Sequence, residues 1–169
     1  MAGIDVAEIF SQGMEYLSLC YGPGGENLLK RKMADSLCVY VEQAAYADFE
    51  QQLYDLVDPT VEDVEALYDR VCREYGFDSW GFDSRSYVDV THFYTNPMYI
   101  ISYVVSNDVA LQIYQMELAE EGAGHALLQE SLFSQESWIL AFADTYGLES
   151  PLAQGRVEAV KKTLETILK

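Results

Sequence analysis

The chain has 169 residues and carries 28 acidic against 10 basic side chains, which gives a net charge of −18. This excess of negative charge repels phosphate groups, so we expect no binding to nucleic acid or to an anionic membrane surface. Half of the residues are hydrophobic, which excludes a disordered acidic tail. Chains of this length usually form one domain, and we expect one helical domain over residues 1–169.

The cysteines and the lack of membrane signals favour the cytoplasm. Cys20, Cys38 and Cys72 are odd in number and form no Cys-x-x-Cys pair, so the sequence predicts reduced thiols instead of disulfides or a zinc ribbon. No stretch reaches the ~18 consecutive apolar residues of a membrane span, and residues 1–5 lack the basic start of a signal peptide. We therefore predict a cytoplasmic protein without a membrane segment.

The first half of the chain has the periodicity of amphipathic helices. Apolar side chains recur at helical spacing over residues 4–20, which end at a Gly-Pro-Gly-Gly turn. One apolar stripe then continues over residues 28–56 and predicts a single long helix. A third helix is expected over residues 61–75, with Thr60 and Asp63 at its N-terminus.

The second half begins with a loop and returns to helices. Residues 76–91 are rich in Gly, Asp and Ser, and Trp80 and Phe82 are expected to anchor them as an ordered loop. A helix is predicted from Pro97 to Glu120. Three further helices are expected at residues 127–133, at 135–146 with Ser134 as a cap, and at 151–168 after Ser150-Pro151. Because alternating strand patterns are nearly absent, the sequence predicts an all-α, multi-helix bundle.

Two carboxylates on the first predicted helix could form a site. Glu8 and Glu15 are seven positions apart and therefore share a face, with Ser11 between them. A solvated acidic face is the commoner explanation of such a pair. The apolar neighbours Phe10 and Met14 indicate that the helix is largely buried elsewhere, which favours the alternative of a metal or acid–base site.

Aromatic side chains gather around one of the two histidines. His92 precedes Pro97, and Tyr99 and Tyr103 follow at a spacing of four, which would place both phenols on one helix face. An imidazole and phenols that converge could donate hydrogen bonds to a developing oxyanion, while the alternative is an aromatic core. The other histidine, His125, has no second histidine at helical spacing and is not expected to act as a ligand.

The acidic residues before His125 have a simpler explanation. Glu117, Glu120 and Glu121 are expected to form a solvated helix end. The following Gly-Ala-Gly is not a Gly-x-Gly-x-x-Gly motif and follows no strand, so it does not predict a phosphate site.

Four segments together resemble one enzyme family. Residues 8–15 (EIFSQGME) resemble the Glu-x-x-Ser-x-x-x-Glu segment of the thimet oligopeptidase and oligoendopeptidase F family of zinc metallopeptidases. Residues 92–103 resemble the His-aromatic-Tyr, Pro-aromatic-Tyr and Tyr signature of oligoendopeptidase F. Residues 34–54 look like the long helix between those motifs, and residues 147–151 look like the family's Gly-Leu-x-Ser-Pro tail. The order of the four segments resembles that of the family, and so does the spacing from the Glu motif to the His-Tyr motif.

The resemblance implies a role for each matching residue. Glu8 matches the third protein ligand of the zinc ion, and Glu15 matches a glutamate that supports the site. His92 matches a loop histidine that contacts the substrate or the transition state. Tyr99 and Tyr103 fall among the tyrosines that bind substrate and stabilise the oxyanion. The implied activity is zinc-dependent cleavage of short peptides by the C-terminal part of an oligopeptidase catalytic domain.

One departure from the family limits this activity. The chain has two histidines and no His-Glu-x-x-His motif, which would precede Glu8 and supply two zinc ligands and the general base. A catalytic zinc ion needs three protein ligands, and only Glu8 remains. We therefore expect the chain alone to be inactive and to bind no zinc, with the missing N-terminal part of the peptidase or a second copy of the chain as partner.

Two other functions stay open at this point. The chain could be a non-catalytic helical module that binds peptides or other proteins, or an unrelated acidic interaction protein. A segment taken from a larger helical domain leaves apolar helix faces uncovered, and such patches favour association. We therefore expect a homodimer in which the helix with Ile9, Phe10 and Met14 is buried in the contact.

Overall fold

The computed structural model describes residues 3–23, 25–77, 81 and 83–168. Within those ranges the regular secondary structure is entirely helical, so the predicted all-α, multi-helix fold is confirmed. The chain divides into two compact units. Unit 1 consists of Met1–Cys38 and Ser102–Lys169, and unit 2 consists of Val39–Ile101.

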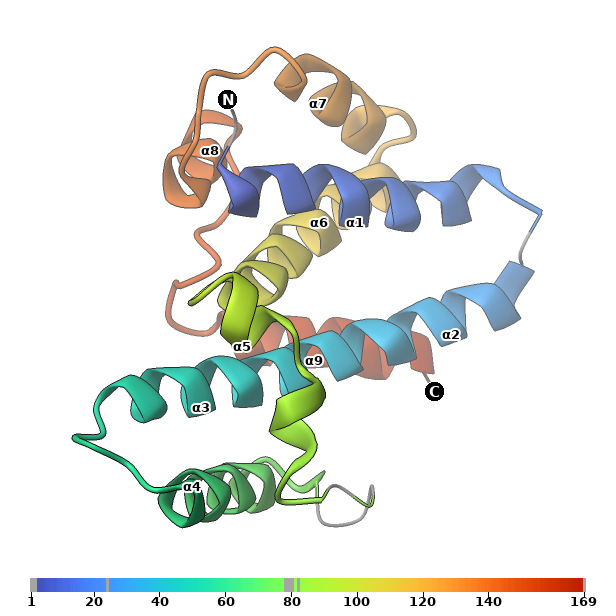
Figure 1. The fold of residues 1–169 in the computed structure, drawn as a ribbon. Helices are drawn as coiled ribbons and strands as arrows, with labels where there is room; N and C mark the ends of the chain where they lie inside the picture. The colour runs from blue at the N-terminus through green and yellow to red at the C-terminus, as the bar shows by residue number, and fades with distance from the viewer. Residues whose placement is uncertain (1–2, 24, 78–80, 82, 169) are drawn as a thin grey trace. The chain divides into compact units, whose positions relative to one another are not determined.

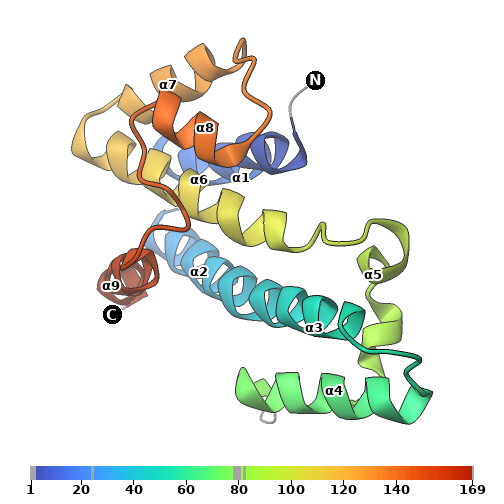
Figure 2. The ribbon, with the colours of Figure 1, turned by 90° about the vertical axis from the view of Figure 1, so that its left-hand side faces the viewer.

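Unit 1 is built around α1 and α6, which lie against each other (Figures 1 and 2). Its helices are α1 (Ile4–Tyr21), α2 (Gly25–Cys38), α6 (Ile101–Ala119), α7 (Ala123–Ser131), α8 (Ile139–Thr145) and α9 (Arg156–Leu168). Helices α7 and α8 contact α1, and α9 packs along α2. The first helix agrees closely with the predicted range.

The core of unit 1 follows the spacing of apolar residues on α1. Val6, Ile9 and Leu17 are buried on one side of that helix, where they meet residues of α6, α7 and α8. Ile9 has no exposed surface, so this residue, expected at a self-association surface, belongs to the core of its own unit. Met14 is 57% exposed. Only part of the expected contact surface is therefore available to a partner.

Hydrogen bonds join the polar residues that α1 and α6 bury. The bonds, donor first, are Ser102 to Asp5 (2.6 Å), Gln12 to Ser106 (3.0 Å) and Tyr16 to Asn107 (3.0 Å). Ser36 of α2 accepts from both Tyr16 and Asn107. Because buried polar groups are costly unless they are paired, these bonds make the contact between the helices specific.

Unit 2 pairs two antiparallel helices (Figure 1). Its elements are the π-helical η1 (Val39–Gln43), α3 (Ala44–Tyr54), α4 (Val61–Glu74), the 3-10 helix η3 (Ser86–Asp89) and α5 (His92–Thr95). The predicted start of α4 is confirmed, because the Thr60 side chain accepts from the Asp63 amide and the Asp63 carboxylate accepts from the Thr60 amide. Trp80 and Phe82, the expected loop anchors, lie outside the described residues.

Aromatic rings form the core of unit 2. Phe49 has no exposed surface, and its ring centroid lies 5.0 Å from that of Tyr68 and 5.2 Å from that of Phe93. Tyr46 and Tyr87 extend the cluster. Offset and edge-on aromatic contacts of this kind add to the free energy gained from burial. The cluster joins α3, α4 and α5.

Several predicted helix bounds are wrong. The short helix expected over residues 127–133 is α7, which begins at Ala123 and ends at Ser131. The expected single helix over residues 28–56 is interrupted by the π-helical η1. Helix α8 begins at Ile139 instead of 135, and α9 begins at Arg156 instead of 151. Ser134 and Ser150 each accept a bond from the amide two residues on, at 3.1 and 3.3 Å. Both serines therefore stabilise turns, a conformation that competes with helix capping.

Candidate functional site

The residues singled out in the sequence are divided between the units. Glu8, Glu15 and Tyr103 belong to unit 1, whereas His92 and Tyr99 belong to unit 2. The structure therefore presents two groups of side chains, and each is described within its own unit.

Glu8 is half-buried on α1 and is held by its own helix. The Ser11 hydroxyl, which is one turn away, lies 2.8 Å from the Glu8 carboxylate and donates to it. Glu15 lies on the same helix but is exposed, and its carboxylate forms an ion pair with Lys32 of α2 at 2.5 Å. The two carboxylates therefore have different surroundings, and the expected supporting glutamate is held by a lysine.

Glu8 is the candidate metal ligand on α1. Nowhere in the described ranges do three or more His, Cys, Asp or Glu side chains gather in a way that could hold a metal ion. A catalytic zinc ion requires three protein ligands. Glu8 could contribute one such ligand.

His92 and Tyr99 lie together in unit 2. Their rings stack with centroids 4.9 Å apart and an angle of 24° between the ring planes. Both residues are half-buried, and the Nδ1 atom of His92 is buried. An imidazole and a phenol placed side by side provide two hydrogen-bond donors that could bind one carbonyl oxygen.

The expected helical relation between Tyr99 and Tyr103 is wrong. Helix α6 begins at Ile101 and not at Pro97, so Tyr99 precedes the helix and Tyr103 lies in its first turn. Asn96 to Tyr99 form a turn, in which the Tyr99 amide donates to the Asn96 carbonyl oxygen at 3.1 Å. Met98 has a φ of 60°, which lies outside the right-handed helical region, so no helix can continue from Pro97 through this residue.

Glu117 has a structural role that the sequence did not reveal. It was expected in a solvated helix end, but it is 5% exposed. Its carboxylate accepts from the Tyr21 hydroxyl and from the backbone amides of Gly122 and His125, the last two at 2.7 and 3.0 Å. These bonds lower the pKa of Glu117 to about 2, the Tyr21 hydroxyl having the largest effect. Glu117 therefore caps the N-terminus of α7.

Glycines could have signalled this arrangement. A Cβ atom added at Gly124 would collide with the carbonyl oxygen of Ile113, so α7 returns tightly against α6. Gly122 has a φ of 89°, a left-handed conformation that favours glycine. The Gly-Ala-Gly sequence thus marks a tight turn between two helices, beside the carboxylate that caps the second one.

Replacing Glu117 with glutamine is expected to lower stability most at neutral pH. Because folding lowers the pKa of Glu117 from a usual value of about 4.5 to about 2, ionised Glu117 stabilises the fold fully at pH values above about 4.5. This contribution is lost as the pH falls toward about 2. Thermal unfolding followed by circular dichroism between pH 7 and pH 2 should show a difference from the wild type that shrinks as the pH falls.

The matched control for this prediction is Glu120→Gln, on the same helix end but exposed to solvent. It should change the melting temperature little at any pH. Equal effects of the two substitutions, or an effect of Glu117→Gln that is the same at pH 7 and pH 3, would contradict the capping role.

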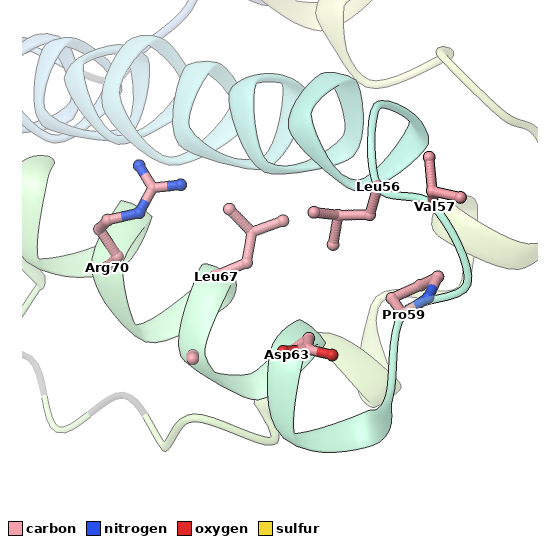
Figure 3. A pocket seen from close by; sticks show the side chains of 7 residues that line it. Leu56, Val57, Pro59, Asp63, Leu67 and Arg70 are labelled. Carbon is pink, nitrogen blue, oxygen red and sulfur yellow. The ribbon is translucent and has the colours of Figure 1, made fainter.

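Unit 2 has a hollow of about 550 Å³ on its surface (Figure 3). It lies between the C-terminal end of α3, the following loop and α4, and Leu56 and Leu67 point into it. In unit 1, a hollow of about 500 Å³ lies between α6 and α9. The linings of these two hollows include none of Glu8, His92, Tyr99 and Tyr103.

Comparison with other proteins adds no relative. The part of the chain described here has no helix with both the length and the apolar character needed to cross a membrane. No protein-family model, no curated protein and no solved structure matches the chain.

Proposed function

We propose that the chain is the C-terminal, peptide-binding part of a zinc-dependent oligopeptidase that cleaves short peptides. The observation that carries this proposal is the stacked pair of His92 and Tyr99, because two residues of one family motif lie side by side there. The order of the four motif segments along the chain supports it. On this proposal the chain holds its peptide but does not cleave it alone.

The two rings can act on a peptide through hydrogen bonds. An extended peptide presents carbonyl oxygens, which accept from phenol and imidazole groups. Donors that are already in place when negative charge develops on such an oxygen stabilise it without reorganisation. His92 and Tyr99 are the proposed donors. Glu8 is the one zinc ligand that we assign to the chain.

A partner and a compartment follow from the same proposal. Unit 1 leaves many large apolar side chains exposed, among them Met14, Leu132, Phe133, Trp138 and Val157. Exposed apolar surface favours association, and we propose that the zinc-binding part of the enzyme covers it. The exposed thiols Cys20 and Cys38 are compatible with a reducing compartment, so we place the protein in the cytoplasm.

Peptide binding tests the proposal directly. Fluorescence anisotropy with a mixture of labelled peptides of five to nine residues should show saturable binding to the chain. Tyr99→Phe removes one hydroxyl donor and should weaken binding about tenfold, the effect of one lost hydrogen bond. Tyr54→Phe is the control, because Tyr54 is exposed on α3 in the same unit and should leave affinity unchanged.

Two results would contradict the proposal, namely no peptide binding, or equal loss of affinity in Tyr99→Phe and Tyr54→Phe. The coding sequence upstream of this chain distinguishes the peptidase from the non-catalytic alternative. A His-Glu-x-x-His motif encoded upstream in the same reading frame decides for the peptidase. Peptide binding without such a motif decides for a binding module.

A further inference from the structure

The turn before Tyr99 has an unusual backbone. Its second residue is Pro97, and its third residue, Met98, has a φ of 60°. Proline fixes φ near −65°, so a positive φ at the third position indicates a type II turn, in which glycine is the preferred third residue. A side chain at that position strains the backbone, and the surrounding structure must hold it there.

Glu50 is placed to hold this turn. It lies on α3 with 1% of its surface exposed, and its Oε1 atom accepts from the Met98 amide at 2.7 Å. The other oxygen, Oε2, is buried and finds no hydrogen-bond partner among the described residues. A buried carboxyl group with one unpaired oxygen lowers the stability of the fold. Stabilisation of the fold alone therefore does not explain why a glutamate lies at position 50.

Consecutive residues of α3 support both rings of the candidate site. Glu50 binds the amide of Met98, which directly precedes Tyr99. Phe49 packs against Phe93, which directly follows His92, with ring centroids 5.2 Å apart. The two segments that carry His92 and Tyr99 are thus fixed to one helix.

We propose that Glu50 is a positioning residue, whose carboxyl group holds the strained Met98 turn and so sets the Tyr99 ring against His92. Glu50 itself need not contact a peptide. That the pair of rings binds peptides rests on the proposed function, whereas the positioning does not, because it concerns only contacts within unit 2.

Nuclear magnetic resonance of His92 can test the positioning. The chain has two histidines, so His125→Gln leaves His92 as the only source of imidazole signals. A stacked Tyr99 ring shifts the carbon-bound proton signals of His92, and Tyr99→Leu in this background gives their positions without the stack. Glu50→Ala should move the signals by more than half of that difference. Glu50→Gln should leave them in place, because its amide oxygen can still accept from Met98.

The control is Asp48→Asn, on the same helix, where Asp48 accepts from Gln52 at 2.8 Å. It should leave the His92 signals unchanged. Unmoved signals in Glu50→Ala, or equal shifts in Asp48→Asn, would overturn the proposal. If Glu50→Ala does not fold, hydrogen exchange of the Met98 amide in the unaltered protein decides. Strong protection supports the bond to Glu50, and exchange at the rate of an exposed amide overturns it.

Peptide affinity separates this proposal from the proposed function. If Glu50→Ala removes the stacking shift but leaves peptide affinity unchanged, the positioning stands and the assigned binding role of the rings fails. If peptide affinity falls while the His92 signals stay in place, the positioning fails and peptide binding stands.

Discussion

Replacing Phe49 with alanine is expected to destabilise unit 2 by about 3–5 kcal/mol. Phe49 has no exposed surface and lies among Tyr68, Tyr87 and Phe93. Its removal leaves a cavity that the surrounding rings, which come from separate elements, cannot fill without moving. The loss therefore includes both the burial of the ring and the contacts of its neighbours.

Amide hydrogen exchange measured by mass spectrometry can localise this effect. In Phe49→Ala, amide exchange should accelerate across α3 and α4. The control is Tyr54→Ala, which truncates an exposed aromatic side chain at the end of α3. It should change the free energy of unfolding by less than about 1 kcal/mol. If Phe49→Ala and Tyr54→Ala prove equally mild, the aromatic cluster does not hold unit 2 together.

Replacing Arg156 with methionine is expected to destabilise unit 1 by about 3–5 kcal/mol, because the buried Asp108 carboxylate, which also accepts from Gln112, then lacks its opposite charge. Arg156 begins α9 and donates to both carboxylate oxygens of Asp108 on α6, at 2.8 and 3.2 Å. Only 9% of the Arg156 side chain and 4% of the Asp108 side chain are exposed. Arg156 also pairs with Glu149 at 2.8 Å.

Urea unfolding of a small set of variants tests this ion pair. The double substitution Arg156→Met with Asp108→Leu should recover part of the loss, because both charges of the buried pair are then removed. Lys30→Met breaks an exposed pair with Glu26 in the same unit and should cost less than about 1 kcal/mol. A loss in Arg156→Met no larger than that of Lys30→Met would show that the pair contributes little.

Local signals in the sequence predicted some helix bounds and not others. The start of α4 depends on Thr60 and Asp63, which are three residues apart and bond to each other, so the sequence contains the whole motif. Ser150 precedes a proline and resembles a helix cap equally well. Its segment instead forms a turn, and α9 starts where Arg156 meets Asp108, a residue that is distant in the sequence. Tertiary contacts therefore decide that bound.

The candidate site was predictable only in part. The resemblance placed His92 and Tyr99 in one motif, and the structure brings their rings together. The contribution of Glu50 could not be predicted, because it depends on a hydrogen bond between residues 48 positions apart. The prediction that Glu117 lies in a solvated helix end is wrong for a related reason. Only the fold reveals that its neighbours are backbone amides at the start of the next helix.

The connectivity of the two units affects how the chain can fold. Unit 2 is one continuous segment, whereas unit 1 joins residues 1–38 to residues 102–169. The core of unit 1 can form only when the intervening segment of about sixty residues is closed into a loop, which costs conformational entropy. During synthesis, α3 and α4 can pair before α6 has left the ribosome. At that stage α1 cannot yet pack against α6. Until then the apolar face of α1 is open to solvent and to chaperones.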